Sequence, residues 1–239
     1  LPTDRPVLRR RVASADMSDT VSYAAGRTDT PLLEETIGAT FARAASRFAA
    51  REALAVRHQG IRWTYAELDA RIDELARGLL AAGLQPGDRV GLWAPNRCEW
   101  VLVQFATARI GVIMVCLNPA YRTTELEFAV RQSGCRMLLA APSFKISDYR
   151  AMWEEVAADC LGVEQTVFFD TAEWSALLAS GATVAPDAVA TVAAGLDHRD
   201  PINIQYTSGT TGLPKGATLT HRNILNNGYF VGEACGFTE

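Results

Sequence analysis

The sequence predicts an α/β protein built on a mostly parallel sheet with helices on both faces. Strand-like runs alternate with helical stretches of ten or more residues between positions 89 and 170, a pattern typical of crossover connections. The run RVGLWA, at 89–94, has the composition of a buried strand. The chain has 239 residues, of which 49% are hydrophobic, so it is long and apolar enough to bury a substantial core.

The elements before position 89 are predicted to be a helix, a hairpin and a second helix. Apolar residues recur at helical spacing over 33–48. The stretch ALAVRHQGIRWTY alternates on either side of its Gln-Gly pair and indicates two short strands. The letters TYAE form a capping box, so the second helix begins after Thr64, and Gly83 is suited to follow its end.

Four strands separated by helices are predicted next. The strands are 89–94, 112–117, 136–140 and 165–170, and the stretches between them are helix 98–111, a turn and helix over 118–134, and helix 147–160. Asn96 is expected to cap the first of these helices.

Three further stretches complete the predicted order of elements. Residues 180–199 contain alanine, proline and glycine and are predicted to be a linker. A strand at 201–207 leads into a polar loop, an extended segment at 216–221 follows, and a helix spans 222–236.

The loop reads YTSGTTGLPKG, at 206–216, and its composition suits an anionic ligand. Its glycines would let backbone N–H groups approach phosphate oxygens, its hydroxyls would add donors, and Lys215 would place a positive charge beside the β- and γ-phosphates. The predicted phosphate-binding residues are Thr207, Ser208, Gly209, Thr210, Thr211, Gly212 and Lys215, with Gly216 as a further flexible position. The alternative interpretation is a solvated hairpin turn.

Several familiar sites do not fit this chain. A Walker A loop needs Gly-Lys-Ser/Thr, but Leu213 and Pro214 separate Gly212 from the lysine. The chain has no G-x-G-x-x-G fingerprint, and a nucleophile elbow at Ser208 would need glycine in place of Tyr206. The histidines show no metal-ligand spacing, so no metal site is predicted.

Other polar and aromatic positions are expected to be structural. The turn at 118–121 follows a strand, where open α/β sheets bind ligands, so a ligand contact there is left open. A packing or capping role is expected for His221, and a solvated helix face for Glu154 and Glu155. Core positions are expected for Trp100, Phe105 and Trp153.

Composition and charge narrow the partners and the compartment. The net charge of −4 gives no basic footprint for nucleic acid, and no apolar run reaches the length of a membrane span. The five cysteines are scattered without a C-x-x-C pair, which favours reduced thiols in a cytoplasmic protein, most of them buried as small hydrophobes.

Residues 1–31 are predicted to be a disordered leader. They are polar and aperiodic, include an Arg-Arg-Arg run, and contain Met17, an alternative start. The arginines also allow a transit peptide, but Asp4 and Asp16 and the missing amphipathic period argue against one. Alanine- and arginine-rich usage favours a bacterial source.

The loop and the blocks before it resemble one protein family. YTSGTTGLPKG resembles the signature of AMP-forming, adenylate-forming enzymes, and WTYAELDARIDELARGLLAAGLQPGDRVGLWAPN and LNPAYRTTELEFAVRQSGCRMLL resemble earlier blocks of the same domain. The stretch DPINIQYTSGTTGLPKGATLTHRNILNNGYFVGE is most similar to the medium-chain fatty-acyl-CoA ligase branch. The resemblance covers the chain from about Leu32 onward.

The resemblance implies a fatty-acyl-CoA synthetase that uses ATP, Mg²⁺ and coenzyme A. A carboxylate, expected to be a fatty acid, attacks the α-phosphate of ATP and releases pyrophosphate, and the coenzyme A thiol then takes the acyl group and releases AMP. Residues 32–239 are then the N-terminal portion of the AMP-binding domain. A homo-oligomer is left open by the sequence.

The family's later motifs have no counterpart on this chain. These are the adenine and Mg²⁺ motif, the ribose-binding aspartate, the hinge and the catalytic lysine of the C-terminal lid domain. The chain is therefore expected to be an inactive fragment whose last elements leave sheet edges or apolar faces uncovered. The alternative function is a non-catalytic nucleotide- or acyl-binding module that retains the loop.

Overall fold

The computed structural model describes residues 29–207 and 214–238, and the described residues from Leu32 onward form one compact unit. A six-stranded sheet runs through this unit in the order β10-β9-β4-β3-β5-β8. Its strands are β3 (Arg89–Trp93), β4 (Ile113–Leu117), β5 (Met137–Ala140), β8 (Gln165–Phe168), β9 (Pro201–Thr207) and β10 (Lys215–Thr220). All neighbouring pairs are parallel except β9 and β10. The predicted mostly parallel sheet is therefore confirmed.

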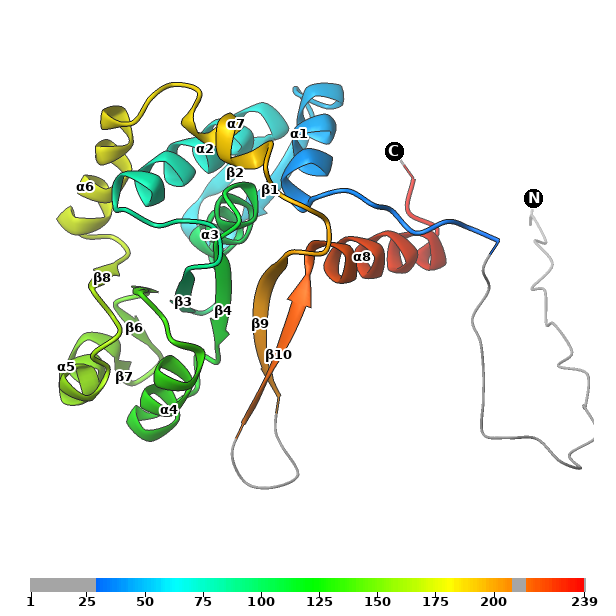
Figure 1. The fold of residues 1–239 in the computed structure, drawn as a ribbon. Helices are drawn as coiled ribbons and strands as arrows, with labels where there is room; N and C mark the ends of the chain where they lie inside the picture. Colours follow the sequence, from blue (N-terminus) through cyan, green and yellow to red (C-terminus); the bar gives the residue numbers. More distant parts are fainter. Residues whose placement is uncertain (1–28, 208–213, 239) are drawn as a thin grey trace, which may run out of the picture. The chain divides into compact units, whose positions relative to one another are not determined.

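Helices cover both faces of the sheet (Figure 1). One layer contains α1 (Ile37–Arg47), α2 (Tyr65–Ala81), α3 (Cys98–Arg109), α6 (Ala172–Ser180) and α7 (Ala188–Ala193). The other contains α4 (Thr123–Ser133) and α5 (Tyr149–Val156), and α8 (His221–Cys235) follows β10. This double cover explains why the central strands are apolar along almost their whole length.

The local signals at the start of the chain are confirmed. Strands β1 (Glu52–Val56) and β2 (Ile61–Thr64) pair antiparallel around the 3-10 turn η1 (Arg57–Gln59). The Thr64 hydroxyl accepts the Glu67 N–H, and the Glu67 carboxylate accepts the Thr64 N–H, so the capping box is complete. Gly83 follows α2 at φ 84°, a conformation that favours glycine.

Two predictions about the middle of the chain were wrong. Asn96 does not cap α3, because the helix begins at Cys98 and Arg97 occupies the N-cap position. The first N–H of the helix, from Cys98, donates to Gln59 Oε1 at 2.7 Å. Residues 180–199 are not a linker, since they contain the 3-10 turn η3 (Gly181–Thr183) and helix α7, which buries Val189.

Two short stretches carry structure that was not predicted from the sequence. Helix α6 lies just before the presumed linker, and it packs against α2. Strands β6 (Ser143–Phe144) and β7 (Ser147–Asp148) form a small hairpin before α5. Helix α5 and the 3-10 turn that extends it, η2 (Ala157–Asp159), both lie within the helix predicted at 147–160.

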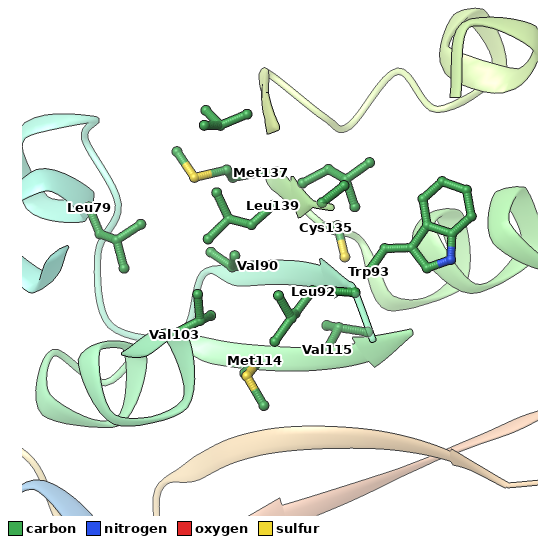
Figure 2. Close-up of a cluster of buried hydrophobic side chains, with 14 of the residues drawn as sticks. Leu79, Val90, Leu92, Trp93, Val103, Met114, Val115, Cys135, Met137 and Leu139 are labelled. Atoms are coloured by element: carbon green, nitrogen blue, oxygen red, sulfur yellow. The ribbon is translucent and has the colours of Figure 1, made fainter. Parts of the chain in front are cut away.

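The core consists of one large cluster that spans both faces of the sheet and a small second cluster formed by Ile37, Ala108 and Ile202. Figure 2 shows side chains of three neighbouring strands in the large cluster: Val90 and Leu92 of β3, Met114 and Val115 of β4, and Met137 and Leu139 of β5. Trp153 is buried as predicted, whereas Trp100 and Phe105 are half-buried at the edge of the core. Glu154 and Glu155 are exposed, also as predicted.

The last elements are much less covered. The first half of α8 is anchored by Asn226, whose side chain exchanges two hydrogen bonds with the backbone of Leu33, at 2.7 and 2.9 Å. Its second half exposes apolar side chains, and the first four residues of the edge strand β10 are exposed as well. The large exposed apolar side chains in this part are Tyr229, Phe230, Val231 and Phe237. The prediction of an uncovered edge and apolar face agrees with this arrangement.

Within the described residues, no helix has the length and apolarity needed to cross a membrane.

Candidate functional site

The signature motif lies on the hairpin formed by β9 and β10. These strands pair antiparallel, and Thr207 and Lys215 face each other at the last pair before the connecting loop. Both residues are exposed, and the Thr207 hydroxyl donates to the Lys215 carbonyl at 3.4 Å. The pairing therefore brings a hydroxyl residue and a lysine, eight positions apart in sequence, to the same end of the hairpin.

The other predicted phosphate-binding residues, Ser208, Gly209, Thr210, Thr211 and Gly212, lie outside the described residues.

The hairpin begins at the carboxyl edge of the parallel sheet. Strand β9 runs parallel to β4, and their last paired residues are Gln205 and Cys116. Thr207 and Asn118 each come two residues after that pair, so the start of the loop and the turn at 118–121 lie at the same edge. This edge is where open α/β sheets bind ligands.

Two residues of the motif have a structural role. Tyr206 donates its hydroxyl to the Ala129 carbonyl at 2.9 Å, which ties β9 to α4. Gly216 pairs with Tyr206 across the hairpin, and a Cβ there would lie 3.0 Å from Ile204 Cγ2 and 3.5 Å from Tyr206 Cζ. The structure thus accounts for Gly216 by close packing of its neighbours, a reason other than the predicted flexibility.

The turn at 118–121 is held by its own hydrogen bonds. The Tyr121 N–H donates to the Asn118 carbonyl at 3.0 Å, and the Ala120 N–H donates to Asn118 Oδ1 at 2.9 Å. The rigid turn predicted at the end of this strand is therefore present. Whether it contacts a ligand stays a prediction.

A second polar cluster lies at the carboxyl ends of β3 and β8. Arg97 binds the Glu99 carboxylate through two bonds of 2.5 and 2.9 Å, and it also binds Asp170 at 2.9 Å. Gln59 donates to Glu99 at 3.1 Å while its carbonyl caps α3, so the cluster joins the β1–β2 hairpin to the sheet.

The electrostatics of this cluster favour its charged form. Burial raises the pKa of the Glu99 carboxyl, but hydrogen bonds from Arg97 and Gln59 outweigh that effect and hold the pKa at about 2. The cluster lines a cavity of about 560 Å³ together with His58, Ile61 and Pro95. The two carboxylates of the cluster already pair with its one guanidinium, so Arg97 has no charge left for an anionic ligand. We interpret the cluster as a structural ion-pair network.

His221 packs as the sequence indicated. It is fully buried at the start of α8, and its Nδ1 accepts the Ile37 N–H at 3.2 Å, which joins α8 to α1. Burial lowers the pKa of its imidazole to about 4, so it is neutral at physiological pH. Among the side chains described, no His, Cys, Asp and Glu residues form a group that could hold a metal ion.

All five cysteines are described, and each is a free thiol. Cys98, Cys135 and Cys160 are buried, Cys116 is half-buried and Cys235 is exposed. Burial raises the pKa of the Cys98 thiol to about 12 and those of Cys116 and Cys135 to about 11. These three are therefore protonated and unreactive at neutral pH, as expected of small core side chains.

A mostly parallel sheet with a glycine- and hydroxyl-rich hairpin at its carboxyl edge defines a ligand-binding α/β domain. The family model described as "AMP-binding enzyme" matches residues 41–238. The chain therefore belongs to the AMP-binding enzyme family, and the resemblance seen in the motif blocks is confirmed.

Relatives and solved structures agree with this assignment. The mouse mitochondrial medium-chain acyl-CoA ligase ACSF2 is 39% identical over 234 residues, covering 89% of this chain and 38% of that protein. A Mycobacterium tuberculosis fatty acyl CoA synthetase superposes with a TM-score of 0.66 at 26% identity, covering 78% of this chain and 34% of that one. The long-chain-fatty-acid-CoA ligase FadD1 of Archaeoglobus fulgidus, 22% identical, shares the fold with a TM-score of 0.73 over 92% of this chain and 43% of its own.

The chain thus spans 38% of the length of the mouse relative that it matches. The matched part includes the whole hairpin and the turn at 118–121.

Proposed function

We propose that the full-length protein containing this chain is an ATP-dependent fatty-acyl-CoA synthetase. A carboxylate would attack the α-phosphate of Mg²⁺-bound ATP, forming an acyl-adenylate and releasing pyrophosphate. The sulfur of coenzyme A would then attack the acyl carbon, forming the thioester and releasing AMP. The observation that carries the proposal is the pairing of Thr207 with Lys215 at the carboxyl edge of the sheet, in a chain of the AMP-binding family.

The proposed role of the hairpin is to hold the leaving pyrophosphate. Hydroxyls of Thr207, Ser208, Thr210 and Thr211 and the N–H groups near Gly209 and Gly212 would donate to the β- and γ-phosphate oxygens. Lys215 would stabilise the negative charge that grows on pyrophosphate as it departs. Mg²⁺ would screen the same oxygens, and phosphoryl transfer depends mostly on such positioning and charge stabilisation.

The predicted substrate is a fatty acid. Relatives named as medium-chain acyl-CoA ligases, at 39% identity, support an acyl-CoA product and a medium-length chain. We also retain fatty acid metabolism, a bacterial source and a cytoplasmic location as predictions from the sequence, although several of the relatives are named as mitochondrial.

The test is ATP–pyrophosphate exchange by the full-length protein. The panel runs from acetate through octanoate to palmitate and includes benzoate as an aryl acid. We expect exchange above the carboxylate-free background with fatty acids, with the largest rate at medium chain length, and acyl-CoA formation when coenzyme A is added. Binding of ATP without exchange on any acid would favour the non-catalytic nucleotide- or acyl-binding module instead.

A further inference from the structure

Two fully buried aromatic residues meet beneath the turn at 118–121. Trp93 is the last residue of β3, and Tyr149 is the first residue of α5. Their rings are stacked, with centroids 3.5 Å apart and planes within 5° of each other. The contact joins the end of a central strand to a helix that begins 56 residues later (149 − 93). Figure 2 shows the Trp93 indole extending beyond Leu92 at the end of β3.

The polar tips of both rings donate to consecutive carbonyls of the turn. Trp93 Nε1 donates to the Asn118 carbonyl at 3.2 Å, and the Tyr149 hydroxyl donates to the Pro119 carbonyl at 2.5 Å. A buried Trp N–H or Tyr O–H needs a partner, so these bonds satisfy the rings as well as the turn. The two rings therefore fix the position and orientation of the turn relative to the core.

With these bonds, the backbone of the turn is largely occupied. The N–H groups of Ala120 and Tyr121 donate within the turn, Pro119 has no N–H, and the carbonyls of Asn118 and Pro119 accept from the aromatic tips. The turn consequently offers side chains outward, among them the exposed Asn118 and Ala120. It has the properties of a rigid wall, not of a backbone cradle for anions.

The wall stands beside the residue that begins the signature loop. Strands β4 and β9 are neighbours in the sheet, and Asn118 and Thr207 occupy equivalent positions two residues past their last pair. A nucleotide whose phosphates lie against Thr207 and Lys215 would therefore have this turn at its side.

We propose that Trp93 and Tyr149 are positioning residues for adenylate formation. They act through the turn at 118–121, which they hold as a fixed wall of the nucleotide site, and they do not touch the substrate themselves. The inference rests on the proposed function. A misplacement of about 1 Å in a reacting pair can cost on the order of 100-fold in rate, so a loosened wall should slow the reaction that needs in-line geometry.

The experiment removes the two donors one at a time. Tyr149→Phe deletes one hydroxyl and keeps the stacked ring. In a separate variant, Trp93→Phe deletes the second donor together with part of the buried indole ring. In the full-length protein with octanoate, we expect the kcat of ATP–pyrophosphate exchange to fall about 10-fold in Tyr149→Phe. The KM for ATP should rise less than about 3-fold, because the turn presents no backbone donors to the phosphates. Thioester formation from supplied octanoyl-adenylate should stay within about 2-fold.

The matched control is Trp153→Phe, a buried tryptophan on the same helix as Tyr149 that has no bond to the turn. A second comparison repeats Tyr149→Phe in an Asn118→Ala background. If Tyr149 acts through the turn, the two effects on exchange kcat should be strongly non-additive. A merely structural role would lower the melting temperature and both half-reactions together.

Each outcome decides the inference. Three results would overturn the inference while leaving the proposed function intact. The first is an equal exchange kcat in Tyr149→Phe, Trp93→Phe and Trp153→Phe. The others are an equal loss of both half-reactions and additivity of Tyr149→Phe with Asn118→Ala. No exchange by the wild-type protein on any carboxylate would overturn the proposed function, and the inference with it.

Discussion

Two regions of the chain differ sharply in burial. One consists of strands β3, β4, β5 and β8, and the other, the terminal unit, consists of β9, β10 and α8. Strands β3, β4 and β5 are almost fully buried, and β8, at the edge of the sheet, buries its last two residues. The terminal unit is held at its base by Asn226 and His221 and is exposed over β10 and the second half of α8. The chemistry-bearing hairpin belongs to the exposed unit, while the covered strands fix where it starts.

This difference in burial corresponds to two requirements, access for a ligand and precise placement of the residues that bind it. A ligand can reach Thr207 and Lys215 only if they are accessible, so the hairpin cannot contribute much to the core. The positioning of these residues comes from the covered strands, through the pairing of β9 with β4 and the bond from Tyr206 to Ala129.

Two helical glycines provide the largest expected contrast between the regions. In α2, a Cβ at Gly78 would overlap the Leu177 carbonyl oxygen, whereas a Cβ at Gly228 in α8 would meet nothing within 4 Å. Gly78→Ala should lower the free energy of unfolding by about 3 kcal/mol, because the backbone of α6 must move away. Gly228→Ala should raise it by about 0.5–1 kcal/mol through helix propensity. Urea denaturation measures both, and equal effects would remove the distinction between the regions.

Lowering the pH should reduce the stability that His221 provides where α8 packs against α1. The pKa of His221 is lowered from an ordinary 6.5 to about 4, so the unfolded chain binds this proton at a higher pH than the folded chain does. The stabilisation is therefore complete above about pH 6.5 and is lost as pH falls toward 4, by up to about 3 kcal/mol. Denaturation curves between pH 7 and 4 should show this loss in the wild type and a flatter profile in His221→Asn, which keeps an acceptor but does not titrate. Parallel profiles for the two proteins would contradict this role of His221.

The smallest effect is expected on the exposed face. Phe237 is 76% exposed, so Phe237→Ala should change the free energy of unfolding of the 239-residue chain by less than about 0.5 kcal/mol. Phe169→Ala, at a fully buried position in the core, should cost about 3–5 kcal/mol in the same assay. A large cost at Phe237 would mean that this face is covered in solution.

Much of the fold could be predicted because its signals are local. The capping box at Thr64, the glycine after α2 and the apolar runs of β3, β4 and β5 each involve residues close in sequence. Helix α7 was missed because alanine, proline and glycine suit a linker as well as a short helix. Helix α6 was missed as well, and both helices pack against α2, a contact that no local pattern encodes.

The candidate site was predictable in part for the same reason. The motif could be read as a continuous stretch, and the turn at 118–121 could be placed at the end of a strand. The network of Arg97 with Asp170 could not, because its partners lie 73 residues apart. The stacking of Trp93 on Tyr149 likewise depends on tertiary contacts that no local pattern encodes.

The most direct test of the central claim is the effect of Lys215→Ala on the two half-reactions of the full-length protein. Lys145→Ala is the matched control, since Lys145 is an exposed lysine between β6 and β7, outside the signature motif. We predict that Lys215→Ala slows ATP–pyrophosphate exchange by about 100-fold, in line with the loss of one charge-stabilising group. Thioester formation from supplied acyl-adenylate should change by less than about 3-fold, and Lys145→Ala should match the wild type in both assays. Equal losses in both half-reactions, or none in either, would contradict the assignment of Lys215 and its hairpin to pyrophosphate.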